Sequence, residues 1–361
     1  MIINTYKRYL LNKFIKKKML VSFIFLILVL IINFIEESNF LKDSNSEIYV
    51  PLLLTLLNAP SLLLEIFPFI FLISTQLFFL DLFENQEILT LRQFGISNFQ
   101  ILKFTTFISF IISLLIMIIF YNFSSIVKNE YLKIKNQFTK DNKYLAVITK
   151  NGLWIKDSQI NGETLIINSK KIQNQFLIDT TITKFDKNFI MIENIIADRI
   201  DIKNNNWKLF NVTKTENDNS SVIYKEYLVN TKFNIDKINN LFSDLSSLTF
   251  FGLLKLEDNY KTIGYSVDEI ILKKNKYFSN IFFMSIMSII GALLVLKTNL
   301  SKKIFLNIFI GIFISVIVYY FLNFFSLLAK NEFMTIQLSV WFPIIFLVII
   351  SLIPAIKINE I

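Results

Sequence analysis

The chain has 361 residues, 53% of them hydrophobic, with a mean hydropathy of +0.53 and a formal net charge of +9. That hydropathy is high for a soluble globular protein and ordinary for a protein that crosses a membrane several times. The absence of cysteine and histidine excludes disulfide scaffolds, thiol nucleophiles, Ser-His-Asp triads and the common zinc motifs.

Six apolar segments, three on each side of a polar insert, are each long enough as helices to cross a hydrocarbon core about 30 Å thick. They cover residues 19–35, 60–83, 101–123, 278–296, 304–328 and 336–356. The fifth contains two amides, Asn307 and Asn323, and no charge, so as a helix it would not face water. We therefore expect a mixed membrane protein with six transmembrane α-helices, arranged as three plus three.

The placement of charge predicts the orientation of these spans. Six basic residues precede the first span: Lys7, Arg8, Lys13, Lys16, Lys17 and Lys18. Four acidic residues follow it: Glu36, Glu37, Asp43 and Glu47. The positive-inside rule places the N-terminus in the cytoplasm. Counting spans then places the loop 81–100 and the C-terminus in the cytoplasm, as the basic residues Lys297, Lys302 and Lys303 of the next such loop also favour. No small-residue cleavage site follows Ile35, so we expect the first span to be retained rather than removed as a signal peptide.

The insert, residues 128–276, falls on the other side of the membrane and is predicted to be mostly β-structure. Candidate strands rich in Ile, Val, Thr, Phe and Tyr are 144–149, 153–156, 164–168, 176–185, 189–201 and 222–233. Asn151-Gly152 and Asn161-Gly162 are turn signals, as are the polar runs 186–188 and 204–206. Short strands at this spacing predict a β-sandwich or jelly roll, and the mixed charge argues against nucleic-acid binding. Residues 245–276 return to helical spacing and predict a short helix pair leading to the fourth span.

The loop between the second and third spans predicts a short amphipathic helix over residues 84–94. Glu84, Glu87 and Leu91 would share one face, with Arg92 beside them. Gly95 suits the left-handed position that ends a helix, and Ser97 can cap the next one. A helix joined rigidly to two membrane helices can transmit a push from a soluble partner. A solvated loop helix with no partner is the alternative.

This loop resembles the ELxxLRxxGxS signature of the LptF/LptG permeases, the membrane subunits of the lipopolysaccharide exporter, with Ile88 in the usual leucine position. Further matches follow in the same order as in that family: Tyr9-Leu10-Leu11, Ala59-Pro60 with Glu65 and Pro68, Gly152-Leu153-Trp154, Leu248-Thr249-Phe250, Gly264-Tyr265-Ser266 and Trp341-Phe342-Pro343. The resemblance covers essentially the whole chain. Its details are closer to LptG than to LptF.

The resemblance implies a multi-pass permease in the inner membrane of a Gram-negative bacterium, with a periplasmic β-jelly roll. It would pair with an LptF-like second permease and an LptB-like ATPase dimer. Lipopolysaccharide would enter through lateral gates near spans one and five, then pass to an LptC/LptA-like bridge. Residues 84–97 would be the coupling helix, with Glu84, Glu87, Leu91, Arg92 and Gly95 as the residues that couple it to the ATPase.

We expect no catalytic residues, no metal ligands and no cofactor bound by the chain itself. It lacks a GxxxxGK[ST] segment, so ATP would be used by the partner ATPase. Candidate lipid-binding or gate residues are Phe34, Lys42, Trp154, Tyr320, Phe321 and Phe325; ordinary packing is the alternative for the aromatic ones. LptG relatives often carry lysines at the end of span one that suit lipid phosphates, and here Lys42 alone fits that role. The expected domains are 1–127, 128–245 and 246–361.

Two other functions stay open. A mechanotransmission permease would move its periplasmic domain without passing lipid, although such proteins usually have four spans. A membrane enzyme acting on lipid-linked sugars would need an organised pair of carboxylates. Glu36, Glu37 and Asp43 are the most compact candidates for that pair.

Overall fold

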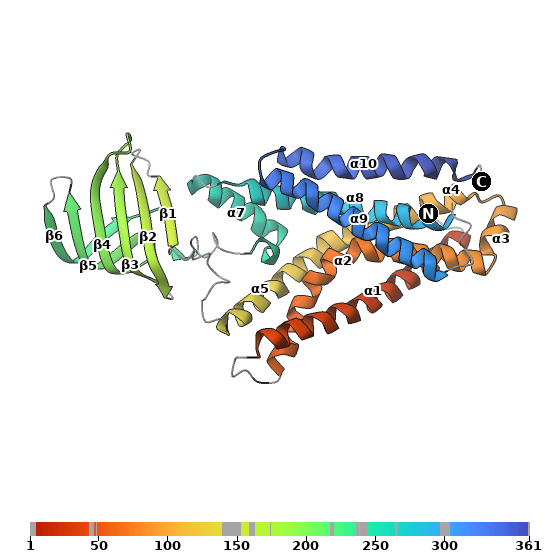
Figure 1. Ribbon diagram of the computed structural model, residues 1–361, viewed down its shortest axis with the longest axis horizontal. Coiled ribbons are helices and arrows are strands. Elements are labelled where there is room, and N and C mark those ends of the chain that lie inside the picture. The colour runs from red at the N-terminus through yellow and green to blue at the C-terminus, as the bar shows by residue number, and fades with distance from the viewer. Residues whose placement is uncertain are drawn as a thin grey trace. The chain divides into compact units, whose positions relative to one another are not determined.

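The computed structural model describes residues 5–42, 47, 49–138, 153–158, 163–173, 175–216, 220–235, 238, 244–263, 266–296 and 304–359. Contacts divide the chain into two compact units, Met1–Tyr131 with Asp268–Ile361, and Leu132–Val267. The first unit is helical and the second contains a sheet (Figure 1). The domain limits expected from the sequence stay predictions.

The helical unit confirms the three-plus-three arrangement. In the part of the chain that the structure describes, six helical spans are long and apolar enough to cross a membrane. They are α1 (Thr5–Phe40), α2 (Tyr49–Glu84), the continuous run of α4 (Asn98–Leu115), η1 (Ile116–Phe120) and α5 (Tyr121–Gln137), α8 (Asp268–Leu296), α9 (Ile304–Lys330) and α10 (Ile336–Ile356). Most of these helices extend beyond the apolar segments because the polar residues at their ends continue the same helix.

α2 and α8 form the centre of this unit, and α1 and α9 lie at its periphery. Of the apolar window in each span, 67% is buried in α2 and in α8, but only 17% in α1 and 22% in α9. α2 packs against α1, α8 and α9. Gly291 of α8 lies directly on the backbone of Leu72 in α2, and Gly311 of α9 lies on the side chain of Gln76. Small residues allow such close crossings, which are common where membrane helices pack.

The third span contains a π-helical turn that nothing in its sequence predicts. The turn is η1, and the backbone N–H of Tyr121 donates to the carbonyl of Ile116 at its end. The hydroxyl of Tyr277, on α8, donates to the carbonyl of Met117 at 2.8 Å. A π turn frees a carbonyl from the α-helical pattern, so this side chain supplies the partner that the helix has lost.

The sheet lies between the third and fourth spans, as expected. Its six antiparallel strands are hydrogen-bonded in chain order: β1 (Leu153–Ser158), β2 (Thr164–Gln173), β3 (Phe176–Phe185), β4 (Met191–Asp201), β5 (Asn206–Glu216) and β6 (Ser221–Asn230). β5 was missed in the sequence, where 204–206 was interpreted only as a turn. The candidate strand 144–149 and the turns at Asn151-Gly152 and Asn161-Gly162 lie outside the described residues.

The side-chain alternation in the sheet changes phase along one row. Leu177 and Thr180 are both buried, as are Leu209 and Val212, although a regular strand would send residues three apart to opposite faces. The intervening Asp179 and Asn211 have left-handed backbones, with φ of 50° and 55°. This explains why an alternating pattern was hard to read in β5.

The buried face of the sheet is closed by the segment after β6. Phe233 and Ile238 join the sheet core there, and the Trp207 indole nitrogen donates to the carbonyl of Phe233 at 2.8 Å. The backbone N–H of Ile235 donates to the carbonyl of Ile202 at 2.9 Å. A 3-10 turn (Leu245–Ser247) and α7 (Phe250–Ile263) follow, so the predicted helical connector is confirmed as α7 and the first turns of α8.

Candidate coupling and lipid-facing sites

The loop between the second and third spans folds as a separate short helix, α3 (Glu87–Gln93). The prediction that this helix starts at residue 84 was wrong. α2 continues through Glu84, and Gln86 then adopts a left-handed conformation with φ of 57°, which breaks the helix. Glu84 is therefore an exposed residue at the end of α2, separate from the helix that Glu87 begins.

The end of α3 is fixed by the two caps that the sequence predicts. Gly95 has φ of 79°, and its N–H donates to the carbonyl of Arg92 at 2.9 Å while that of Ile96 donates to Leu91 at 3.0 Å. These two bonds form a Schellman motif. Ser97 and Gln100 then make a capping box at the start of α4. The joint between α3 and α4 is therefore held by backbone hydrogen bonds at Gly95 and Ile96 and by side-chain-to-backbone bonds between Ser97 and Gln100.

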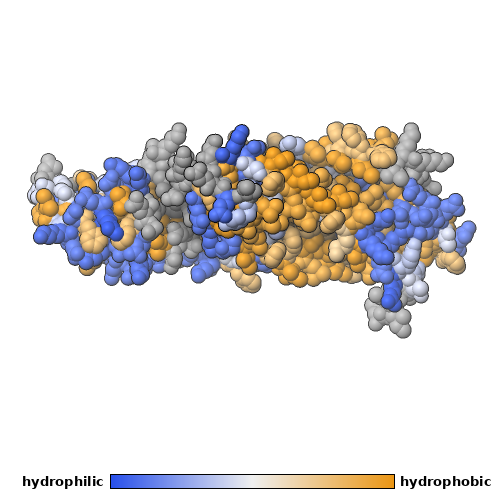
Figure 2. Space-filling view, turned by 90° about the horizontal axis from the view of Figure 1, so that it is seen from below, coloured by the Kyte–Doolittle hydropathy of each residue, from blue (hydrophilic) through white to orange (hydrophobic). Residues whose placement is uncertain are grey.

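One face of α3 is packed into the end of the helical unit. Ile88 is buried and Leu91 partly buried in a core that also contains Leu10 and Phe14 of α1, and Ala355 of α10. The beginning of α1, α3 and the end of α10 thus lie at the same end (Figure 1). Figure 2 shows hydrophilic residues at that end and apolar residues over the middle of the unit.

Two large apolar residues that the sequence reasoning did not single out are exposed here, Leu89 within α3 and Phe94 at its C-cap. Leu89 is 57% exposed and Phe94 80% exposed. Arg92, beside them, is exposed overall, and its Nε donates to Asn98 Oδ1 at 3.1 Å. The signals that could have identified them differ: Leu89 falls outside the face that carries Ile88 and Leu91, and Phe94 stands at the end of the helix, directly before Gly95.

Glu87 faces α1. Its Oε1 accepts from Lys13 Nζ at 2.7 Å and from the Tyr9 hydroxyl at 2.9 Å. Lys13 also pairs with Asp81 Oδ2 at 2.6 Å, and Lys17 pairs with Asp81 Oδ1 at 2.9 Å. Among the described residues, Glu87 is thus the member of the predicted coupling set that forms an ion pair within the chain, and its role toward an ATPase stays a prediction.

The far end of α1 carries a second set of polar contacts. The Asn58 amide donates to Asn33 Oδ1 at 3.0 Å, and the Tyr131 hydroxyl donates to Glu37 at 2.7 Å. Glu37 is buried whereas Glu36 is exposed, so these two carboxylates do not form the pair that the enzyme alternative needs. Asp43 lies outside the described residues.

Phe34 and Lys42 are both exposed near this end of α1. Lys42 follows the last turn of the helix, where the buried Leu41 fixes the chain. These positions are compatible with contact to a lipid acyl chain and to its phosphate, respectively. Both roles stay predictions.

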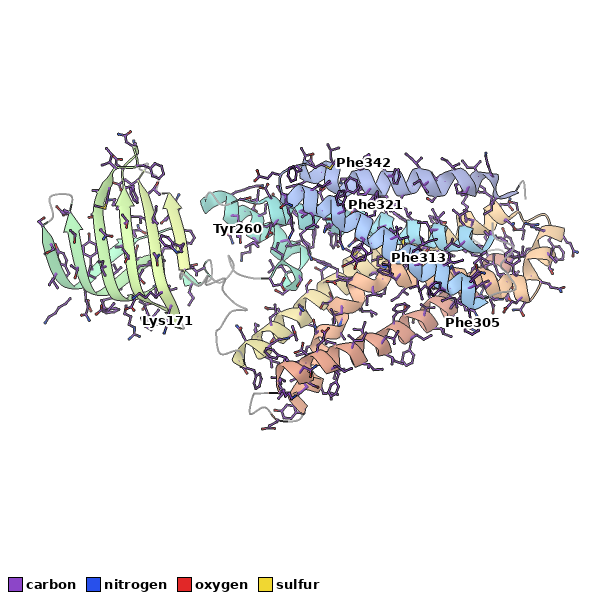
Figure 3. All side chains as sticks on the ribbon, viewed as in Figure 1. Lys171, Tyr260, Phe305, Phe313, Phe321 and Phe342 are labelled. Atoms are coloured by element: carbon purple, nitrogen blue, oxygen red, sulfur yellow. The ribbon has the colours of Figure 1, made fainter. Side chains whose placement is uncertain are left out.

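The aromatic residues of α9 divide into two groups. Phe321 packs against Phe346 of α10 with ring centroids 5.5 Å apart, and Phe325 packs against Phe342 at 5.4 Å (Figure 3). These two residues therefore help to join α9 to α10. Tyr320 instead is 68% exposed, on the same helix as the exposed Phe305 and Phe313.

Trp154 is exposed on β1, in a row that runs across the sheet to Ile196 and Ile223. It lies on the face opposite the sheet core, since its neighbours Leu153 and Ile155 are buried. Gly152, Gly264, Tyr265 and the loop lysines 297, 302 and 303 lie outside the described residues.

A family model described as the lipopolysaccharide export system permease LptF/LptG matches residues 8–357. No curated protein matches the chain. The matched range contains every helix and strand described above except the first residues of α1.

Proposed function

The chain belongs to the LptF/LptG family of lipopolysaccharide export permeases, and from this premise we propose that it is a membrane subunit of an ATP-driven exporter that extracts lipopolysaccharide from the inner membrane. The observation that carries the proposal is α3, a short helix fixed between two membrane spans, with an exposed Leu89 and an exposed Phe94 at its C-cap. The chain is the permease and not the motor, because its sequence contains no phosphate-binding loop.

The ATPase partner would be an LptB-like dimer that receives α3. Leu89 and Phe94 supply apolar area that would be removed from water in a groove, and Glu84 and Arg92 surround them with charge. A few well-placed apolar anchors commonly dominate such contacts. The basic residues near the start of α1 support a cytoplasmic position for this end.

The second permease, LptF-like by the closer resemblance of this chain to LptG, would cover the peripheral helices. α1 and α9 bury the smallest share of their apolar windows, and both carry rows of outward aliphatic and aromatic side chains. Lipid would enter beside these helices, with Phe34 and Tyr320 on the route and Lys42 near a phosphate. An apolar route of this kind requires no charged relay in the spans.

A periplasmic LptC/LptA-like bridge would receive the lipid from the sheet domain. In the part of the chain that the structure describes, β6 pairs with β5 on one side only. Its exposed residues include Ile223 and Leu228. An exposed edge strand can pair with a strand of another protein, which is a common way to extend a sheet across an interface.

Reconstitution in vesicles tests the proposal. The chain, its second permease and the ATPase are placed in vesicles that contain lipopolysaccharide, and transfer of lipid to a soluble bridge protein is measured with and without ATP. We expect transfer that requires ATP and is lost with a hydrolysis-deficient ATPase.

Two outcomes would contradict the proposal. ATP turnover with no lipid transfer, together with no photocrosslinking from position 34 to lipopolysaccharide, would favour the mechanotransmission alternative. Turnover of a lipid-linked sugar by the purified chain alone would favour the enzyme.

A further inference from the structure

A cluster of ion pairs joins the start of α1 to α2 and α3. We name it the α1 clamp and define it as Tyr9, Lys13, Lys17, Asp81 and Glu87. All four of its polar contacts are 2.9 Å or shorter.

Lys13 is the centre of the clamp because it alone contacts both carboxylates. Its Nζ lies 2.6 Å from Asp81 of α2 and 2.7 Å from Glu87 of α3. Its side chain is 14% exposed and that of Glu87 is 24% exposed. Charged hydrogen bonds that are largely shielded from water are stronger and more geometrically defined than surface pairs. The clamp therefore fixes the start of α1 relative to α2 and α3.

Lys17 is a natural comparison for Lys13. It lies one helical turn further along α1 and pairs with Asp81 at 2.9 Å. Among the described residues, Lys17 makes no ion pair or hydrogen bond with α3. Lys17 thus joins α1 to α2, whereas Lys13 joins α1 to α3 as well.

At this end α1 also packs against α2 and α4, and the buried Lys18 Nζ donates to Ser109 Oγ of α4 at 3.2 Å. Among the described residues, its polar contacts with α3 are those of Tyr9 and Lys13. Its buried Leu10 and Phe14 share a core with Ile88 of α3. Beyond them, most of the helix presents apolar residues outward. A rigid helix that is held at one end transfers a displacement of that end along its length.

We propose that Lys13 is a positioning residue that passes the movement of α3 to α1 through its ion pair with Glu87. The inference rests on the proposed function, since it assumes that an ATPase moves α3. Glu87 then acts inside the permease, while the exposed Leu89 and Phe94 hold the ATPase. Lys13 changes the position of α1 and does not itself bind the ATPase or the lipid.

The absence of cysteine in the chain allows a direct measurement. Spin labels are placed on Ile31→Cys of α1 and Ile345→Cys of α10, both exposed positions. The distance between them is measured in the full complex, without nucleotide and in the ATP-bound state. The same preparations are assayed for ATPase co-purification, ATP turnover and lipid transfer.

We expect the wild-type clamp to give an ATP-dependent change in distance that Lys13→Gln abolishes. Lys13→Gln should retain the bound ATPase and lower lipid transfer per ATP by about tenfold, within the usual range of coupling between sites. Lys17→Gln should keep the distance change, and Lys13→Arg, which retains the charge, should restore it. If Lys13→Gln is not recovered from membranes, Glu87→Gln replaces it; in preparations that still co-purify the ATPase, it should abolish the distance change.

Three outcomes would overturn the inference. If Lys13→Gln shows the same ATP-dependent distance change as the wild type, Lys13 does not pass the movement of α3 to α1. Equal losses in Lys13→Gln and Lys17→Gln would show that the clamp only supports the packing of α1. A wild-type complex that does not bind the ATPase, or shows no distance change with ATP, would instead contradict the proposed function and remove the premise of the inference with it.

Discussion

At the scale of single residues, the α3 segment contains one set of residues that packs against the helical unit and a second set that is exposed. Glu87, Ile88 and Leu91 face the helical unit, and Leu89 and Phe94 face away from it. The inward residues hold α3 in place, and the outward ones are available to a partner. Because the two sets do not overlap, a change on the outer face should leave the fold intact.

Replacing both outward residues tests this separation. Leu89→Ala combined with Phe94→Ala should weaken ATPase binding by about tenfold or more, since each change removes apolar area from the proposed contact. The thermal unfolding midpoint should stay close to wild type because both side chains are exposed. Binding is measured by titrating the purified ATPase against the permease complex in nanodiscs.

Gln93→Ala is the matched control, because Gln93 is also exposed on α3 but is polar. It should leave both quantities unchanged. Wild-type affinity in the double variant would show that α3 does not dock through these residues.

The residues of this site differ in how far they could be predicted from sequence. Gly95 and Ser97 were predicted correctly because their caps use bonds to neighbours within five residues. The partner of Glu87 could not be predicted in the same way, since Lys13 lies 74 residues earlier in the chain. The basic N-terminal stretch was interpreted as an orientation signal, and the structure shows that Lys13 also has a specific contact.

At the scale of elements, the close crossing of α2 and α8 depends on one missing side chain. A Cβ on Gly291 would overlap the carbonyl oxygen of Leu72 and lie 3.2 Å from its Cα. Both obstacles are backbone atoms of a buried helix, so the helices themselves would have to separate.

Gly291→Ala should therefore destabilise the helical unit by about 1–3 kcal/mol, the usual cost of overpacking a core. Gly311→Ala is the comparison, because its Cβ would meet the amide end of Gln76; moving that side chain breaks its hydrogen bond to the carbonyl of Asn307 but displaces no helix backbone. We expect a smaller loss there. The measurement is the thermal unfolding midpoint of each variant in the same detergent. Equal midpoints for Gly291→Ala and wild type would contradict the crossing seen here.

Elements were predictable from sequence where one regular period runs through them. The span 336–356 was predicted with the bounds that α10 has, and 176–185 with those of β3. β5 was missed because its buried positions change phase at Asn211, so neither a strand nor a helix period fits the whole segment. The π turn in η1 was missed for a related reason: it depends on a hydroxyl from α8, far along the chain.

At the scale of the whole helical unit, polar contacts occupy both ends of α1 and exposed apolar residues occupy its middle. A helix of 36 residues is about 54 Å long at 1.5 Å per residue, well beyond a hydrocarbon core of about 30 Å. The α1 clamp near one end and the Glu37–Tyr131 contact near the other can therefore both lie outside the hydrocarbon. The two ends of the unit are thus chemically able to respond to different partners on opposite sides of the membrane.

Measuring the orientation of this unit in the membrane is the most direct test of the hypothesis that the protein is an exporter subunit. Single cysteines at Phe94→Cys and Trp154→Cys lie on α3 and on β1, and both native side chains are exposed. If the basic start of α1 keeps α3 in the cytoplasm, a membrane-impermeant maleimide should label position 154 in spheroplasts and position 94 only in inverted vesicles. The wild-type chain has no cysteine, so it supplies an unlabelled background. Labelling of position 94 in intact spheroplasts would reverse the orientation, and an ATPase in the cytoplasm could then not reach α3.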